Sequence, residues 1–168
     1  MKRFLMALTM AGALALPAHA AFAETSQAAS GTFKVVSETV VSVQQVGPDC
    51  VIHLAVVFSF DGTLVGSFNP PANFVLVQHA PCSQSGPVTF VAAGAFQGTV
   101  NGAAGSFNFI FVGSLPDPQH AHGTLYILRG TGQLAHLRGT LVLTGTPHVG
   151  GTYAGTLALG SGDVVMAR

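Results

Sequence analysis

The chain has 168 residues, of which only 7% are Asp, Glu, Lys or Arg, against about 25% in an ordinary soluble domain. Its six basic and six acidic side chains cancel, so the chain lacks the basic surface that a nucleic-acid-binding protein requires. Hydrophobic residues make up 49% of the sequence, which excludes an intrinsically disordered protein and is enough for one folded domain with its own core.

Segment 1–23 is typical of a secretory signal peptide. The basic pair Lys2-Arg3 precedes an uncharged apolar run over 4–16, and small residues follow as far as a cleavage site that we predict after Ala23. The apolar run is shorter than the roughly 20 residues that cross a bilayer, and no later segment reaches that length. We therefore expect a secreted or periplasmic protein with no membrane span after signal removal.

The rest of the sequence predicts short β-strands and no helix. We expect a flexible N-terminal arm over 24–30, one β-domain over 31–160 and a C-terminal tail over 161–168. Apolar and polar residues alternate within the domain, and Gly, Pro, Asn and Asp separate the alternating runs. These signals place strands at about 31–45, 51–60, 63–68, 73–79, 88–100, 103–113, 122–129, 138–145 and 151–159.

Two connections carry the strongest sequence signal for a tight hairpin. Asp61-Gly62 and Asn101-Gly102 each lie between two predicted strands, and both residue pairs tolerate the positive φ angles of a two-residue turn. A series of short strands joined in this way would leave exposed edges in an open sheet, and closure of the sheet removes them. The sequence therefore predicts an all-β fold, a single closed antiparallel β-barrel with about eight principal strands.

The alternation also predicts which side chains form the core. Every second residue of 52–60 and of 107–111 is apolar, and most of these residues are phenylalanine. In the first strand the inner face is expected to carry Phe33, Val35, Val41 and Val43. Glu38 is expected to face solvent. The opposite faces carry Thr, Ser, Ala and Val in place of charged residues, so we expect this surface to form a homo-oligomer.

The two cysteines, Cys50 and Cys82, allow only one intramolecular pairing. Export would bring them into an oxidising compartment, where a disulfide between them is favoured. A loop of this length would give a stabilisation of about 3–4 kcal/mol on the loop-entropy model. The alternative is a free nucleophilic thiol activated by His53 or His79, which lie close by in sequence.

The second half of the chain carries a recognisable series of motifs. Residues 96–107 read FQGTVNGAAGSF, residues 129–140 read RGTGQLAHLRGT, and the last strand contains GTYAG at 151–155. This series resembles a family of small uncharacterised bacterial proteins with an allene-oxide-cyclase-like β-barrel of the calycin type. The likeness covers roughly 30–160 and is weakest over 45–90. The resemblance implies a calycin-type barrel without an agreed activity, so no catalytic residue is carried over.

Large hydrogen-bonding side chains are rare in the strands of the second half, where they are Tyr126, Arg129 and Tyr153. A tyrosine inside an apolar core needs a partner for its hydroxyl group. That partner is either a ligand or a group of the protein, such as the backbone or Arg129. Together with Phe58 and Phe109, these three residues form our candidate site for a small hydrophobic ligand.

Histidines suggest a second kind of site. His120 and His122 are two residues apart, so in a strand both side chains would lie on the same side. His136 or His148 would supply a third ligand for zinc or copper. The pair lies at a junction between a loop and a strand, where polar residues are common for other reasons. We therefore predict no metal site.

The glycine-rich segment 130–132 is similar to a nucleotide-binding loop in composition only. A phosphate-binding loop leads into a helix, whereas this segment leads back into a predicted strand. We expect Leu134 and Leu137 to close one end of the barrel here, and we predict no cofactor.

Three functions fit these features. The first is a binding module for a small hydrophobic ligand, and the second is a structural or surface-interaction protein that forms oligomers. The third is a cyclase or isomerase that confines a hydrophobic unsaturated substrate, which depends on fold analogy alone. We favour the first and predict no catalytic residues, because no nucleophile motif or acid–base pair has a recognisable spacing.

Overall fold

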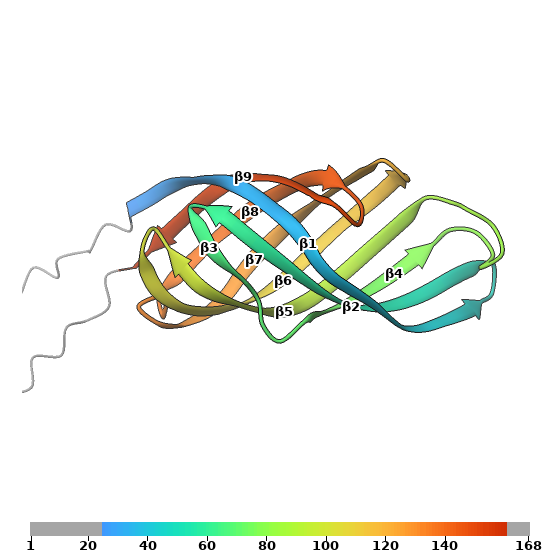
Figure 1. Cartoon of the computed structure of the whole chain (residues 1–168), viewed down its shortest axis with the longest axis horizontal. Helices are drawn as coiled ribbons and strands as arrows, with labels where there is room; N and C mark the ends of the chain where they lie inside the picture. Colours follow the sequence, from blue (N-terminus) through green and yellow to red (C-terminus); the bar gives the residue numbers. More distant parts are fainter. Residues whose placement is uncertain (1–24, 161–168) are drawn as a thin grey trace, which may run out of the picture.

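The structure, a computed structural model, describes residues 25–160, so the predicted signal peptide and C-terminal tail lie outside the described residues. These residues form nine strands (Figure 1). The strands are β1 (Thr25–Val46), β2 (Asp49–Gly62), β3 (Leu64–Phe68), β4 (Ala72–Gln78), β5 (Val88–Val100), β6 (Ala103–Asp117), β7 (His120–Gly132), β8 (Leu137–Thr146) and β9 (Gly150–Leu159). None of the described residues belongs to a helix long and apolar enough to span a membrane.

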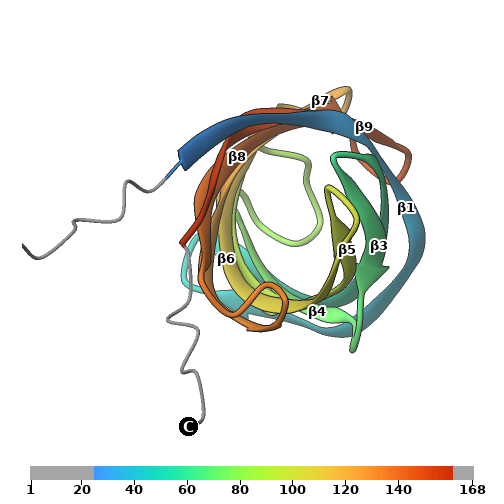
Figure 2. The same ribbon diagram turned by 90° about the vertical axis from the view of Figure 1, so that its left-hand side faces the viewer.

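The strands make one antiparallel sheet that returns on itself as a ring. The order is β1-β9-β8-β7-β6-β5-β3-β2-β4, and β1 also pairs with β2 while β4 pairs with β5. Figure 2 looks along the axis of this ring. β3 and β4 both lie between β2 and β5, one after the other, so the nine strands occupy eight positions around the ring. The predicted all-β antiparallel architecture is therefore confirmed.

The structure corrects our prediction for the N-terminal arm. Residues 25–30 are a continuous part of β1 and are paired with residues 154–159 of β9. They replace the flexible arm that we expected over 24–30. The pairing supplies backbone hydrogen bonds to both strands, and it places Ala29 in the core at 3% exposure. The polar composition of this segment suits its outer face and does not prevent strand formation.

The turn signals locate the hairpins correctly. Asn101 and Gly102 have φ angles of 50° and 83° between β5 and β6, as a two-residue turn of this type requires. Asp61-Gly62 likewise lies at the turn from β2 to β3. Both turns belong to the end of the ring at which β1 begins and β9 ends (Figure 1).

Phenylalanine and aliphatic side chains fill the inside of the ring at this end. Phe96 stacks on Phe107 with ring centroids 4.7 Å apart, and Phe68 stacks on Phe109 at 4.3 Å. The turn between β7 and β8 adds Leu134, which has no exposed surface, and Leu137, so the predicted plug is confirmed. The close approach of this turn requires glycine at 130, where a Cβ atom would collide with the Leu134 carbonyl oxygen.

Two register shifts in β1 change which residues face inward. The first lies between Val35 and Ser37 and the second between Val40 and Ser42, so one extra residue is inserted each time. The prediction that Glu38 is exposed holds for the residue as a whole, but its side chain is turned to the inner face of the ring, because Glu38 is paired with the inward-facing Val56. The strict alternation that we assumed also misplaced Val41, which lies within the second shift and is 66% exposed.

The predicted disulfide joins Cys50 and Cys82. Cys50 is buried at the start of β2, whereas Cys82 belongs to the exposed connection between β4 and β5. No free cysteine occurs among residues 25–160, which excludes the nucleophilic-thiol alternative. The disulfide ties this connection to the end of the ring opposite the packed end.

Candidate functional site

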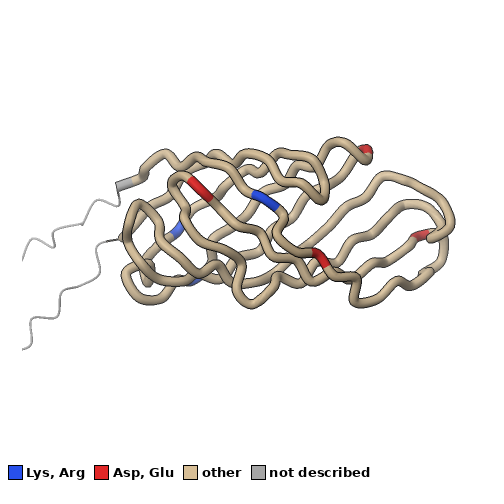
Figure 3. Tube along the Cα trace, in the orientation of Figure 1, with Lys and Arg blue, Asp and Glu red and all other residues tan. Residues whose placement is uncertain are grey.

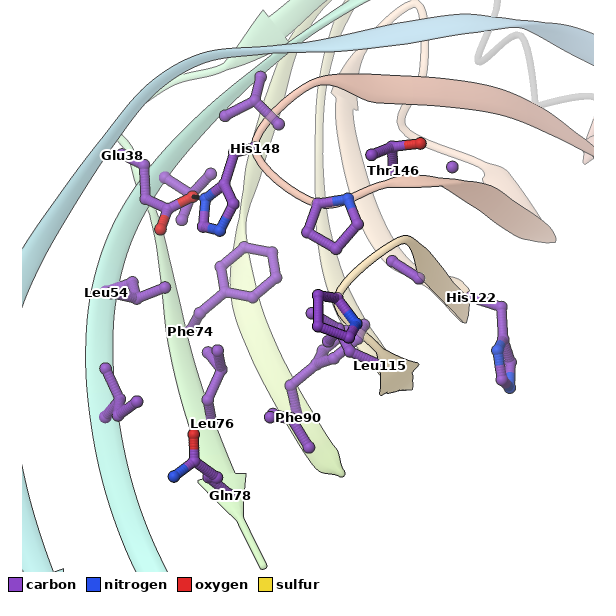
Figure 4. Close-up of a pocket in the computed structure, with 18 of the residues that line it drawn as sticks. Glu38, Leu54, Phe74, Leu76, Gln78, Phe90, Leu115, His122, Thr146 and His148 are labelled. Carbon is purple, nitrogen blue, oxygen red and sulfur yellow. Dashed lines mark hydrogen bonds and ion pairs between the residues drawn. The ribbon is translucent and has the colours of Figure 1, made fainter. Parts of the chain in front are cut away.

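The ring is hollow at the end opposite the start of β1. A cavity of about 680 Å³ opens there, a volume within the range of sites for small organic ligands. Its inner part is lined by buried apolar side chains, which are Phe33, Leu54, Val56, Phe58, Phe74, Phe111 and Leu143. Figure 4 shows how Phe74, Leu76 and Phe90 project from β4 and β5 into this space.

Phe58 separates the cavity from the packed core. One side of its ring lines the cavity, and the ring also stacks on Phe68 at 5.1 Å, a residue that does not line the cavity. Phe33 packs beside Phe58 at 5.1 Å and forms another part of the same floor. The cavity is therefore a half-open cup above a solid base.

The rim of the cup is polar and is made by connections between strands. The connection over 79–87 contributes residues 85–87 to one side of it, and the Gln78 amide group donates hydrogen bonds to the carbonyl oxygens of Pro81 and Gln84. The backbone N–H of Cys82 donates to the Gln45 side chain at 2.8 Å. These contacts and the disulfide hold the connection beside the opening.

Glu38 and His148 meet at another part of the rim. The Nδ1 atom of His148 lies 3.0 Å from Oε2 of Glu38 (Figure 4). The Glu38 side chain is only 23% exposed, whereas that of His148 is 75% exposed and sits in the turn between β8 and β9 with a φ angle of 64°. An acidic group thus lies in the wall of an otherwise apolar cup, covered by an exposed imidazole.

Asp117 forms a second polar cluster at the rim, in the turn between β6 and β7. Its Oδ1 accepts hydrogen bonds from the backbone N–H groups of Gln119 at 2.8 Å and His120 at 3.0 Å, and the His120 Nδ1 atom is 2.8 Å away. The N–H of Gln119, followed by the His120 side chain, holds the pKa of Asp117 below its ordinary value. The carboxylate therefore stays ionised and keeps this turn closed.

Charge is distributed unequally between the two ends. Arg129 and Arg138 lie near the turn that joins β7 to β8 at the packed end, and Lys34 is paired with Ser59 of β2. Figure 3 shows the Lys and Arg residues of the described fold on that half of the ring. No Lys or Arg lines the cavity among the described residues, whereas Glu38 and Asp117 both do. The opening is therefore acidic apart from its histidines.

The predicted ligand-binding residues are not brought together. Phe58 lines the cavity, but Phe109 packs on the far side of Phe68, inside the solid core. Tyr126 and Arg129 lie on the outer face of β7, where Tyr126 is 43% exposed. Alternation accounts for Tyr126, because Leu125 and Ile127 occupy the inner face beside it, whereas a register shift at Leu128 turns Arg129 outward.

Tyr153 does point inward, but it lies in the packed end and its hydroxyl group is satisfied by the backbone. The hydroxyl oxygen accepts a hydrogen bond from the N–H of Leu64 at 2.8 Å, and the hydroxyl donates to the carbonyl oxygen of Asp61 at 3.2 Å. Burial raises the pKa of Tyr153 above its ordinary value. This tyrosine is therefore a structural link between β9 and the turn from β2 to β3.

The histidines of the metal alternative are dispersed. His122 lies at the rim of the cavity, where its Nε2 atom contacts the Ser114 hydroxyl group, and His136 lies in the turn at the opposite end. His120 and His148 each face a different carboxylate. Among residues 25–160 no group of three or more potential ligands is placed to hold a metal ion.

Sequence reasoning missed Glu38 and His148, the polar pair of the cavity wall. The sequence carried a signal for Glu38, because Ser37 and Thr39 break the apolar alternation of the first strand. Such a break is typical of an inserted residue, which moves the following residues to the opposite faces of the strand. His148 follows Pro147 in a predicted turn, and nothing local indicates that it reaches across to β1.

Comparison with known proteins gives a family and a fold. No curated protein matches the chain. A crystal structure of a protein with unknown function from the DUF3224 family of Shewanella oneidensis MR-1 is similar, with a TM-score of 0.62 and 20% identity over 82% of this chain and 100% of that one. Residues 29–155 match the family described as "Protein of unknown function (DUF3224)". The chain therefore belongs to the DUF3224 family, a finding that supports the resemblance to uncharacterised proteins seen in its sequence.

Proposed function

We propose that the protein binds a small hydrophobic ligand in the cup at the open end of the ring. The observation that carries this proposal is a cavity of about 680 Å³ whose inner wall consists of buried Phe, Leu and Val side chains. Apolar surface of this kind is unfavourable in contact with water, and a ligand that covers it gains about 25 cal/mol per Å². A few polar groups at the rim would orient such a ligand.

A neutral fluorophore, N-phenylnaphthylamine, tests the proposal by its increase in emission on entering an apolar site. We expect saturable binding to the native protein and an affinity at least about tenfold lower in Leu76→Trp, because the indole would fill space beside Phe74 and Phe90. Val75→Trp is the matched control, since Val75 is adjacent in β4 and does not line the cavity. Absence of binding, or an equal effect of the two substitutions, would contradict the proposal.

We also propose that the ring is a barrel of the calycin type and that the protein is exported before it acts. Cleavage after Ala23 would leave β1 intact, because this strand begins at Thr25. The disulfide is compatible with an oxidising compartment. Fractionation of the native host, with N-terminal sequencing of the protein, should find Glu24 as the first residue outside the cytoplasm; an uncleaved cytoplasmic chain would oppose export.

A second proposed role is association between copies through the outer surface of the sheet. Val91 faces Val112 across β5 and β6, and Ile110 faces Tyr126 across β6 and β7, so exposed apolar side chains are neighbours there. A second copy would meet this surface without repulsion between like charges. Light scattering on native protein should show a dimer or larger species that Ile110→Lys dissociates; a monomer at all concentrations would oppose this role.

A further inference from the structure

We infer that the cup selects an apolar ligand with a positively charged head group, such as a protonated amine, and that Glu38 holds that head group. This inference rests on the proposed ligand-binding function and adds the chemical class of the ligand. It follows from three properties of the open end. Among residues 25–160 no Lys or Arg lines the cavity, the Glu38 carboxylate lies in the cavity wall, and the contact of this carboxylate with His148 is weak.

The lining of the cup is unsuited to an anionic ligand. Carrier proteins for carboxylates need a cation or several directed N–H groups at the place where the carboxylate rests. No Lys or Arg lines this cavity among residues 25–160. Lys34 of β1 is exposed and pairs with the outward-facing Ser59, so it cannot supply a charge inside.

Glu38 is placed to recognise a cation. It lies in the wall beside Leu54 and Phe74, at the boundary between the apolar interior and the polar rim (Figure 4). Its side chain is 23% exposed although the residue as a whole is open to solvent, and a positively charged partner would form a charge-assisted contact with the carboxylate. Within the described residues its Oε2 atom contacts His148, and no hydrogen bond is made to Oε1.

The contact with His148 leaves room for a ligand. His148 belongs to a short turn and its side chain is 75% exposed, so the ion pair that it forms when protonated is weak and easily exchanged. An ammonium group entering with an apolar chain would bind Oε1 beside the imidazole or displace the imidazole. Asp117, which also lines the cavity, and Asp49 at the start of β2 add a negative potential that attracts the same kind of ligand.

Three ligands of equal chain length separate head-group recognition from apolar binding. Decylamine, decanol and decanoate, each below its micelle concentration at neutral pH, are titrated against the complex of the native protein with N-phenylnaphthylamine. We expect decylamine to displace the fluorophore best and decanoate worst, with an advantage of the amine over the alcohol of about fivefold at low salt. Added salt should reduce that advantage, because the contribution is electrostatic.

The variant Glu38→Gln removes the charge and keeps the shape of the side chain. We expect it to bind the neutral fluorophore and decanol as the native protein does, and to lose the preference for decylamine. Asp61→Asn is the matched control, because it makes the same chemical change at the packed end, where the Asp61 carboxylate accepts only from the Gly62 N–H. His148→Ala should retain the preference, since the imidazole competes with the ligand for Glu38.

The outcomes separate the inference from the function on which it rests. If the fluorophore binds but the three head groups bind alike, or Glu38→Gln keeps the amine preference, the inference is overturned and ligand binding stands. A preference for decanoate overturns it in the same way. If neither the fluorophore nor any of the three ligands binds the native protein, the proposed function and the inference both fail.

Discussion

The two ends of the ring are built from the same strands and the same kinds of side chain, yet one end is solid and the other is hollow. At the packed end Leu64, Phe96, Phe107, Leu134 and Tyr153 fill the interior and have almost no exposed surface. At the open end the inward side chains cover only the wall of a cavity of about 680 Å³. Alternation along the strands therefore predicts an inner face, but it does not predict whether that face is filled.

The connections decide the difference. At the packed end the turn from β7 to β8 inserts Leu134, and Tyr153 bridges to Leu64. At the open end the connection over 79–87 is held beside the opening by Gln78 and by the disulfide of Cys82. Among residues 25–160, no connection at that end contributes a fully buried side chain comparable to Leu134, so the space remains available to a ligand.

The largest effect is expected from truncating a phenylalanine at the packed end. Phe96→Ala should lower the free energy of unfolding by about 3–5 kcal/mol, because it removes a fully buried ring that stacks on Phe107. Phe90→Ala, at the partly exposed cavity wall, should cost less than half as much, and chemical denaturation measures both. Equal losses would show that the two ends are packed alike.

The disulfide should affect stability next. Replacing Cys50 and Cys82 together by Ala should cost about 3–4 kcal/mol on the loop-entropy model, given their separation of 32 residues. Hydrogen exchange should show the loss of protection in β4 near Gln78 before β3 near Leu64. Uniform loss of protection along the ring would contradict a local role of the disulfide at the open end.

Tyr153→Phe tests the bridge at the packed end. The change leaves the buried N–H of Leu64 without its partner, which should cost about 1–3 kcal/mol. Tyr126→Phe is the matched control, because Tyr126 is on the outer face and should cost less than about 0.5 kcal/mol. A similar loss in both variants would contradict the structural role of the Tyr153 hydroxyl.

The same tyrosine gives a pH dependence with a defined sign. The pKa of Tyr153 is raised above its ordinary value of 10.0 chiefly by burial, so folding favours the protonated hydroxyl. Its contribution is complete below pH 10 and is lost as the pH rises through the raised pKa. Native protein should therefore lose stability at high pH more steeply than Tyr153→Phe, as thermal unfolding across that range will show; parallel curves would contradict this.

The smallest effect is expected at the rim, from Asp117→Asn. The pKa of Asp117 is lowered from 3.8, first by the N–H of Gln119 and then by His120, so its contribution is present above that value and is lost as the pH falls through the lowered pKa. The thermal unfolding midpoint of the variant should be slightly lower than that of the native protein at neutral pH. The two midpoints should become equal at acidic pH. A difference that is independent of pH would exclude this carboxylate as the cause.

Much of the fold follows from the sequence, because alternation and turn residues act locally. The Asn101-Gly102 turn, the inward phenylalanines of β6 and the Leu134 plug are each written in a few consecutive residues. The pairing of 25–30 with β9 was missed because a polar segment next to a predicted cleavage site has no local signal that it forms a strand.

The site was less predictable, because it depends on insertions and on contacts between distant residues. Two register shifts turn Glu38 inward, and the residue that meets it, His148, is 110 positions away. Tyr126 and Tyr153 are the same type of residue in neighbouring parts of the sequence. Their positions in the alternation of β7 and β9 place Tyr126 on the outer face and Tyr153 on the inner face. A single displaced residue in a strand reverses such an assignment.

Methyl-group NMR during a titration with decanol tests most directly whether the open end is the binding site. The account predicts saturable shifts in the Leu54, Val56 and Leu76 methyl signals, which belong to the wall of the cup, and unchanged signals from Leu64, Leu125 and Leu134 in the solid end. Shifts confined to the exposed valines of the outer surface, or equal at both ends of the ring, would contradict it.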